Sequence, residues 1–263
     1  MLFHVYVTLC LFVSCFANII NFADIGGVSE DYSENAAWKN GGLLNETFAL
    51  LKAGDTLLIP DATFYIMGGI LGSNFNDVTI EINGKLLFSN DTKNWPVNAD
   101  GSRVLSCIYL TNISNVVFTS SNPSARDMGG SGGIIDGNGQ KWWGFPGLGY
   151  LHYAENRPRM FFVEIASNIL VENLLFKDSP YHTFSVYKVD GLEVRFSEIS
   201  ARRTEQENHN TIDMTAFNTD GYDVTGRNVW IHDSSVWCQD DTIAVKDDSQ
   251  NMLFERINAS GVG

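Results

Sequence analysis

A short phrase of alternating apolar and polar residues recurs along the chain. In each copy, a turn residue is followed by apolar residues at the first and third positions after it. The turn residues are Asp77, Asn115, Asn168, Gly191, Asn228 and Asn251. Strict alternation is typical of strands that bury one face. We therefore predict a short strand after each of these turns.

The spacing of the copies indicates a stacked repeat. Successive turn residues are 38, 53, 23, 37 and 23 residues apart, so one spacing occurs twice and the longer ones leave room for insertions. In the last four copies, an apolar residue recurs at the eighth position after the turn: Phe176, Ile199, Val236 and Ala259. A period in the twenties is typical of a solenoid, in which each unit buries its apolar face against its neighbours.

Among repeat architectures, the pattern favours an all-β parallel β-helix. An antiparallel sandwich would need more hairpin dipeptides, and leucine-rich repeats would need a fixed Leu/Asn frame. The segment 34–52 is predicted to be a short helix that covers the N-terminal end of the coil, where an uncovered end would expose apolar side chains and strand edges. No linker or domain boundary is evident, so residues 18–263 are predicted to form one β-helix domain.

Composition agrees with one folded domain and narrows its partners. The 263 residues are 44% hydrophobic and 18% charged, with 24 Gly and only 6 Pro. The formal charge is −14. This charge argues against nucleic acid as a partner, because nucleic-acid binding requires a basic face.

The N-terminal residues 1–17 resemble a secretory signal peptide. Their apolar run is too short for a comfortable membrane span and ends at the small residue Ala17, with Cys15 at the −3 position. The alternative is a buried first strand or helix. A signal peptide predicts a secreted protein, extracellular or in a cell wall, with no membrane span.

Two further features bear on secretion. Four Asn-x-Ser/Thr sequons are predicted to carry glycans on surface turns, at Asn45, Asn90, Asn112 and Asn258. Once the signal is removed, only Cys107 and Cys238 remain. They either form one disulfide or stay as two buried thiols, and they make no zinc cluster.

Three aspartates carry the candidate chemistry. Asp220 and Asp240 are 20 residues apart, close to one repeat, and Asp241 follows directly. One turn of a parallel coil advances by about 4.8 Å, so these carboxylates are expected to share a groove. Crowded carboxylates raise at least one pKa, which supplies the acid and the base that glycoside hydrolysis needs.

Two other interpretations of these aspartates remain open from residue types alone. Aspartates are common in turns, where they are usually solvated, and we assign Asp247 and Asp248 to that class. Clustered carboxylates are also suited to calcium.

Several segments resemble glycoside hydrolase family 28, the polygalacturonases and their relatives. Asn218-Thr219-Asp220-Gly221 is similar to the family's NTDG motif, and Gln239-Asp240-Asp241 to its DD motif. Further similar segments are Leu57–Tyr65, Gly84–Asn90, Gly133–Gly139 with Trp142-Trp143, Arg157-Pro158-Arg159, Asn168–Phe176 and Lys177–Pro180. The resemblance extends from about residue 20 to the last residue.

The resemblance implies a fold and a reaction. The expected fold is a right-handed parallel β-helix, and the expected reaction is hydrolysis of α-linked galacturonan in pectin with inversion. Asp240 would be the general acid, and Asp220 with Asp241 would position and deprotonate the water. An inverting geometry requires about 6.5–9.5 Å between acid and base, and we expect the site to meet this. No cofactor or metal is implied.

The sequence departs from the family at its end. Val262 stands where the family usually has the His of a Gly-His-Gly segment, and the downstream Arg-x-Lys motif has no counterpart. We expect a truncated chain that lacks its last coils, or a divergent member. Thr242, where many relatives have Cys, removes at most a local disulfide.

Substrate binding by an acidic chain requires locally placed cations. Lys246 is the preferred candidate because it follows the DD strand, with Asn218 and Gln239 as further substrate-binding residues. Other cations in the matched region are Arg202, Arg203 and Arg256. Cleft-lining candidates, with ordinary packing as the more common role, are His182, His209, Trp142, Trp143, Trp230 and Trp237.

These observations predict a secreted, monomeric glycosidase that acts on pectic galacturonan or a related polysaccharide. The main alternative is a non-catalytic β-helical wall or surface protein that binds polysaccharide, motivated by Val262 and the absent Arg-x-Lys. A calcium-dependent polysaccharide lyase is a third, less favoured interpretation. Endo or exo action and the exact polysaccharide stay open.

Overall fold

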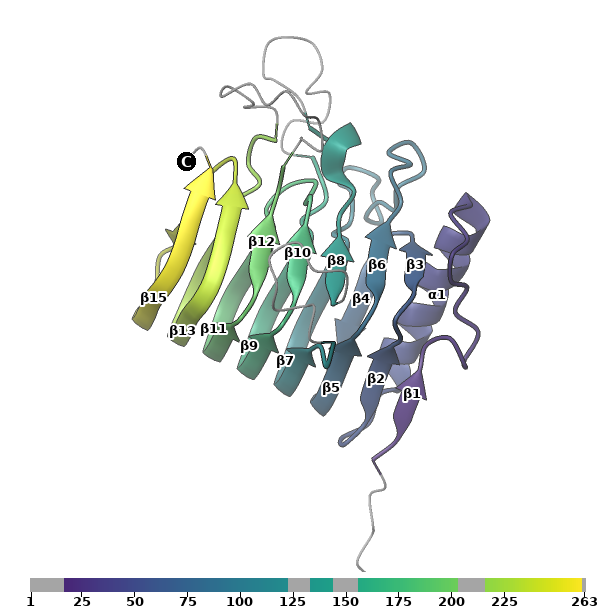
Figure 1. Cartoon of the computed structure of the whole chain (residues 1–263), viewed down its shortest axis with the longest axis horizontal. Helices are drawn as coiled ribbons and strands as arrows, with labels where there is room; N and C mark the ends of the chain where they lie inside the picture. Colours follow the sequence, from purple (N-terminus) through teal and green to yellow (C-terminus); the bar gives the residue numbers. More distant parts are fainter. Residues whose placement is uncertain (1–16, 123–132, 144–155, 203–215, 262–263) are drawn as a thin grey trace, which may run out of the picture.

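The computed structural model describes residues 17–122, 133–143, 156–202 and 216–261. These residues form a parallel β-helix whose strands stack coil upon coil along the long axis (Figure 1). Every strand pair in the ladder is parallel. The predicted fold class is therefore confirmed.

The ladder divides into three faces. The first face contains β4 (Ile70–Ser73), the beginnings of β7 (Ile108–Thr119), β9 (Phe161–Glu172), β11 (Phe184–Arg195) and β13 (Tyr222–Cys238), and β14 (Ile243–Val245). The second face contains β1 (Ile19–Asn21), β2 (Thr56–Ile59), β5 (Asn76–Ile82), the later parts of β7, β9, β11 and β13, and the start of β15 (Gln250–Gly261).

The third face returns the chain to the next coil. It contains β3 (Thr63–Ile66), β6 (Lys85–Phe88), β8 (Ile134–Asp136), β10 (Leu175–Lys177), β12 (Glu198–Ser200) and the ends of β13 and β15. A short 3-10 helix, η2 (Gly139–Lys141), follows β8. The turns from the third face to the first are the part of the coil that matters for function.

The repeated sequence phrase marks one corner of the coil. All six turn residues have positive φ, from 52° at Asn115 to 85° at Gly191, a conformation that Asn, Asp and Gly adopt most readily. The Asn side chains also bond between coils, from Asn168 to Asn115 (2.7 Å) and from Asn251 to Asn228 (2.6 Å). The sequence pattern thus reports a real structural repeat.

The apolar positions of the phrase stack in register inside the coil. Val116 pairs with Ile169, Ile169 with Leu192, and Leu192 with Val229. The eighth-position residues stack in the same way on the third face, in the order Phe176, Ile199, Val236 and Ala259. Each coil therefore buries its inward side chains against the next coil, which is where most of the stabilising burial lies.

The predicted helix is α1 (Glu34–Leu50), which begins as expected and ends two residues before Lys52. Ser33 caps it by accepting a hydrogen bond from the backbone N of Ala36 (3.2 Å). Leu44 and Phe48 are buried in the core, and α1 packs beside the first coils at the N-terminal end (Figure 1). No helix in the described residues is long and apolar enough to cross a membrane. The predicted signal peptide, apart from Ala17, lies outside the described residues.

Candidate active site

A column of turn residues runs along the edge between the third and first faces. The backbone N of Met160 bonds to the O of His182 (3.0 Å), Thr183 N to Asp220 O (2.9 Å), and Gly221 N to Asp241 O (2.8 Å). On the preceding coil, Cys107 N bonds to Arg159 O (2.8 Å). Arg159, His182, Asp220 and Asp241 therefore occupy equivalent positions of successive coils, and we call them the turn column.

The structure brings Asp220, Asp240 and Asp241 together. One carboxylate oxygen of each lies within 4.8 Å of one oxygen of the other two. Asp220 is only 6% exposed, Asp240 is half-buried and Asp241 is exposed. This distance joins single oxygens, whereas the 6.5–9.5 Å expected for an inverting pair separates the two carboxyl groups, so that expectation stays a prediction.

Asp220 is the carboxyl whose environment is most unusual. Burial raises its pKa from 3.8 to about 6, the nearby carboxylates of Asp223 and Asp240 add to the effect, and His182 opposes it. Its Oδ1 is buried and has no hydrogen-bond partner among the described residues. Asp220 therefore holds a proton under mildly acid conditions and is ionised above about pH 6.

Asp240 is held by two N–H donors. Asn218 Nδ2 donates to its Oδ2 (3.0 Å), and the backbone N of Asp241 donates to its Oδ1 (2.9 Å). Asn218 is itself fixed, because its Oδ1 accepts from Arg157 Nη2 (2.9 Å). Asn218 has φ of 57°, a turn conformation that aims its amide at the next coil. The side chain of Asp240 is therefore oriented before any substrate arrives.

The buried side chain and backbone of Gln239 bond to the preceding aspartate-bearing turn. Gln239 is 5% exposed, its Oε1 accepts from the backbone N of Ala216 (2.6 Å), and its own N donates to Thr219 Oγ1 (3.1 Å). These bonds tie the two aspartate-bearing turns together. Its expected contact with substrate stays a prediction that this arrangement does not favour.

Lys246 and His182 both contact Asp223, a residue that sequence reasoning missed. Lys246 Nζ lies 2.8 Å from Asp223 Oδ1, and His182 Nδ1 lies 2.7 Å from Asp223 Oδ2. Burial alone would raise the pKa of Asp223, but its bonds to His182 and Lys246 outweigh burial and lower it. The bond to Asp223 raises the pKa of Lys246. Lys246 therefore reaches the site, but as the partner of a protein carboxylate.

His182 connects this pair to the three aspartates. Its Nε2 lies 3.8 Å from Asp220 Oδ1, and its ring stacks on Tyr181 with centroids 3.9 Å apart. The sequence held a signal for Asp223, which stands three residues after Asp220. That signal was indistinct because an Asp on a strand is usually solvated, whereas this one is buried and contacts His182 and Lys246.

Within the described ranges, two sets of side chains have ligand atoms close enough to hold a metal ion. They are Asp220 with Asp240 and Asp241, and His182 with Asp220 and Asp223. Calcium prefers six to eight oxygen ligands. The three carboxylates supply part of such a shell, so removal of divalent ions belongs in any assay of this site.

The remaining candidates lie apart from the aspartates or outside the described residues. Arg256 pairs with Asp233 on the second face, and Trp230 lies on the same face. Arg202 stacks over Trp237, with 4.9 Å from its guanidinium carbon to the ring centroid. Trp142 and Trp143 are buried, and Trp143 Nε1 donates to Ser179 O (2.8 Å). Outside the described residues are Arg203, His209 and Val262.

The sequons differ in their surroundings. Asn45 lies in α1 and not on a turn, and its side chain bonds to Leu71 N (2.6 Å) and Gly69 O (3.2 Å). The turn predicted for Asn45 was therefore wrong. Asn90 follows β6, Asn112 is exposed at a corner of β7, and Asn258 is exposed on β15. The last three lie outside helices and stay predicted glycan sites, although Asn112 Nδ2 donates to Asn74 Oδ1 (2.6 Å).

The two retained cysteines are free and buried. Cys238 lies beneath the aspartates, where its Sγ donates to Asp240 O (3.1 Å). Of the two possibilities that the sequence left open, the structure has the pair of thiols.

Comparison with known proteins places this chain in a family. A family model described as glycosyl hydrolases family 28 matches residues 55–262. Endo-xylogalacturonan hydrolase A of Aspergillus tubingensis is 26% identical over 220 residues, which cover 83% of this chain and 48% of that protein. The putative galacturan 1,4-alpha-galacturonidase C of Aspergillus niger is 24% identical over 259 residues, which cover 94% and 57%. The chain thus spans about half the length of the curated relatives it matches.

Solved structures share the fold. The family 28 exopolygalacturonase of Yersinia enterocolitica has a TM-score of 0.66 at 12% identity, with 94% of this chain and 49% of that chain covered. The hyperthermoactive exopolygalacturonase of Thermotoga maritima has a TM-score of 0.64 at 17% identity, with 92% and 60% covered. At these identities the likeness establishes the architecture alone.

Proposed function

Because the chain belongs to glycosyl hydrolases family 28, we propose that it hydrolyses the α-linked galacturonan of pectin or a closely related polysaccharide. The observation that carries the proposal is the convergence of Asp220, Asp240 and Asp241 at one edge of the coil, within 4.8 Å of one another. Two of the three residues come from one turn and the third from the turn before. Water and a glycosidic oxygen can both reach such a group, since Asp240 and Asp241 are not fully buried.

The roles proposed for the three aspartates are those that the family resemblance implies. Asp240, held in place by Asn218, gives its proton to the departing glycosidic oxygen. Asp220 and Asp241 hold a water molecule and take its proton as the water attacks the anomeric carbon. Asp220 performs this role only when it is ionised, which its pKa of about 6 permits from near-neutral pH upward. The net step adds water across one glycosidic bond.

Inversion at the anomeric carbon is a further part of the proposal. The expectation rests on the family resemblance, and the alternative outcome is retention. Proton NMR of the first product decides between them. Inversion predicts that the β-anomer of the new reducing end forms first, and early α-anomer contradicts it.

We also propose that the protein acts outside the cell. The support is the signal-like sequence of residues 1–17 and the sequons that lie outside helices, at Asn90, Asn112 and Asn258. Expression in a eukaryotic secretory host tests this: a cleaved, glycan-bearing protein in the medium is expected, and a retained, unglycosylated one contradicts it.

The central test is reducing-sugar release from polygalacturonate, with Asp240→Asn as the variant and Asp247→Asn as its matched control. Asp247 is exposed in a neighbouring turn. We expect the Asp240 variant to lose activity by about 10²–10⁴-fold and the Asp247 variant to retain it. Equal activity of the two variants would overturn the assignment of the acid.

The same assay separates hydrolysis from elimination. We expect saturated products, with no ultraviolet absorbance from a new double bond and no effect of a chelator. Unsaturated products together with inhibition by the chelator would establish the calcium-dependent lyase chemistry and contradict hydrolysis.

A further inference from the structure

A basic pocket opens beside the N-terminal end of the turn column. Its volume is about 250 Å³, and three arginines line it, Arg103, Arg157 and Arg159, together with the rings of Phe162 and Tyr181. Arg159 belongs to the column itself and stands two coils before Asp220. At about 4.8 Å per coil, this offset corresponds to roughly 10 Å along the groove.

Two of the three arginines are not neutralised by any carboxylate in the part of the chain that the structure describes. Among the described residues, neither Arg103 nor Arg159 forms an ion pair. The guanidinium of Arg159 lies over the ring of Phe162, 4.8 Å from its centroid. In a chain with a formal charge of −14, adjacent unpaired arginines are a local exception to the overall charge. Such a pair attracts an anion from solution.

Arg157 has a different role and connects the pocket to the aspartates. It is 3% exposed, and it donates to Phe217 O (2.7 Å) and to Asn218 Oδ1 (2.9 Å). Its guanidinium also lies over Tyr181, 4.6 Å from the ring centroid. Tyr181 in turn stacks on His182 of the turn column. One continuous set of contacts therefore runs from the pocket wall to Asn218 and Asp240.

We propose that Arg103 and Arg159 bind the carboxylate of an acidic sugar unit, in a subsite about two coils from the bond that is cleaved. This inference rests on the proposed action on an acidic polysaccharide. A guanidinium pairs with a carboxylate through two parallel N–H donors, which fixes the orientation of the sugar as well as its charge. Phe162 and Tyr181 offer apolar faces to the carbon side of the ring.

The subsite offers two guanidinium groups that no described carboxylate pairs with. Lys246 is engaged by Asp223, and Asp220, Asp240 and Asp241 repel a polyanion. Cationic recognition two coils away holds an acidic chain in place without neutralising the aspartates that the chemistry requires. The pocket therefore contributes specificity for uronate over neutral sugar.

The test measures binding and not turnover. Calorimetry in the Asp240→Asn background follows a galacturonate hexamer and its fully methyl-esterified form, which carries no charge. Arg159→Gln and Arg103→Gln are the variants, and Arg227→Gln is the matched control, because Arg227 is an exposed arginine on the second face that pairs with Asp190. Circular dichroism and melting temperature confirm that each variant is folded. A further variant, Arg159→Lys, retains the positive charge but not the two parallel N–H donors of the guanidinium.

We expect each pocket variant to weaken binding of the acidic hexamer about tenfold and to reduce the salt dependence of binding. Binding of the methyl ester is expected to stay unchanged, as is binding by the Arg227 variant. Arg159→Lys should fall between wild type and Arg159→Gln. Equal losses for the acid and the ester would overturn the subsite, as would losses no larger than in the control. Failure of the Asp240→Asn protein, with both arginines intact, to bind the acidic hexamer would also overturn it.

The outcome separates this inference from the proposed function. If the acidic hexamer binds through the arginines but polygalacturonate is not cleaved, the subsite stands and the hydrolase activity fails. If polygalacturonate is cleaved and the arginine variants bind the hexamer as well as the parent does, the activity stands and the subsite fails.

Discussion

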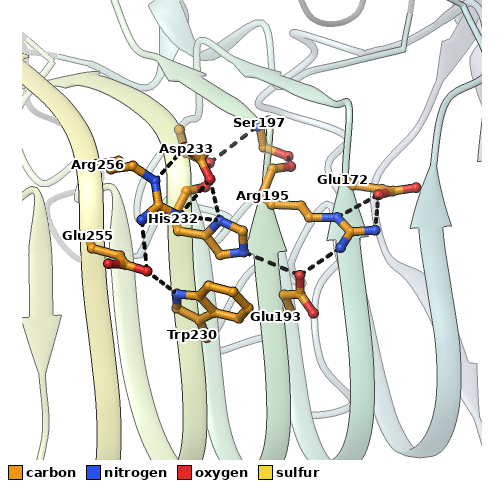
Figure 2. Close-up of polar contacts among 10 residues, drawn as sticks. Glu172, Glu193, Arg195, Ser197, Trp230, His232, Asp233, Glu255 and Arg256 are labelled. Atoms are coloured by element: carbon orange, nitrogen blue, oxygen red, sulfur yellow. Dashed lines mark hydrogen bonds and ion pairs between the residues drawn. The ribbon is translucent and has the colours of Figure 1, made fainter.

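Two clusters of ionisable side chains on the same β-helix are built in opposite ways. In the active-site cluster of Asp220, Asp240 and Asp241, three carboxylates lie within 4.8 Å without an arginine or lysine paired to any of them among the described residues. On the outer surface of the second face, by contrast, acidic and basic groups alternate. Figure 2 shows this second group, which we call the paired network.

The paired network links four successive coils. Arg195 bonds to Glu172 (2.8 Å) and Glu193 (2.8 Å), and Arg256 bonds to Asp233 (2.7 Å). His232 lies between them, with Nδ1 2.6 Å from Asp233 Oδ2 and Nε2 3.2 Å from Glu193 Oε1 (Figure 2). Each group has an opposite charge or a hydrogen bond, so the network stabilises the stacking of coils.

The pKa directions express the same contrast. In the network, the bond to Arg256 lowers the pKa of Asp233, and the bond to Glu172 raises the pKa of Arg195. In the active-site cluster, burial raises the pKa of Asp220 to about 6. A shift that favours the charged form adds stability, and a shift that disfavours it costs stability. The aspartate cluster therefore costs stability where the paired network adds it, as expected for the catalytic role that we propose for it.

The largest expected effect comes from Asp220→Asn. Removal of the ionisable group should lower polygalacturonate hydrolysis by about 10²–10⁴-fold, because the attacking water loses its base. At neutral pH the same change should raise the free energy of unfolding, by on the order of 1–2 kcal/mol after solvent screening, because a buried charge is removed. Activity assays and chemical denaturation measure the two effects. A variant that is both active and less stable would show that Asp220 belongs with the paired groups.

The free energy of unfolding should change with pH in opposite directions for the two clusters. Because the folded-state pKa of Asp220 is above its ordinary value of 3.8, its destabilising effect is full above about pH 6 and disappears as pH falls toward 3.8. The pKa of Asp233 is depressed, so its contribution is present above the ordinary value and is lost as pH falls below it. Hydrolysis should rise with pH through about 6 if Asp220 is the base. A fall through that pH would make Asp220 the acid instead.

An intermediate effect is expected from His232→Ala in the paired network. His232 is 5% exposed and stacks on Trp230 with centroids 3.8 Å apart, so its loss leaves Asp233 and Glu193 with fewer partners. We expect the free energy of unfolding to fall by about 1–3 kcal/mol. Hydrolysis at a temperature where both proteins are folded should be unchanged. A large loss of activity there would mean that the two clusters are coupled.

Much of the fold was predictable because the corner of the coil has a chemical signature. Asn, Asp and Gly are favoured at a positive-φ turn, and apolar residues at fixed distances after it point inward. The repeat can therefore be recognised from the types of residue alone. The helix predicted over 34–52, as a cover for the N-terminal end of the coil, is α1 (Glu34–Leu50) in the structure.

The site was predictable only in part, because its geometry depends on turns and not on alternation. The meeting of the aspartates followed from their one-repeat spacing. The roles of His182, Asp223 and Arg157 did not, because each is defined by a partner on another coil and by burial. Lys246 was placed correctly near the site, but its pairing with Asp223 was not foreseen.

The smallest expected effect concerns the two thiols. Their rates of alkylation test whether the structure opens more readily around the aspartate cluster than elsewhere. Burial raises the thiol pKa of both Cys107 and Cys238, so both should react slowly with an alkylating reagent in the folded protein. Cys238 lies beneath the crowded aspartates, where local opening relieves repulsion, and it should be labelled a few-fold faster than Cys107. Peptide mass spectrometry after timed labelling measures both rates. Asp220→Asn should remove part of the difference, because it removes the buried charge, whereas His232→Ala should not do so selectively. If the two thiols react equally, or if Asp220→Asn leaves their ratio unchanged, then the aspartate cluster does not loosen the structure around it.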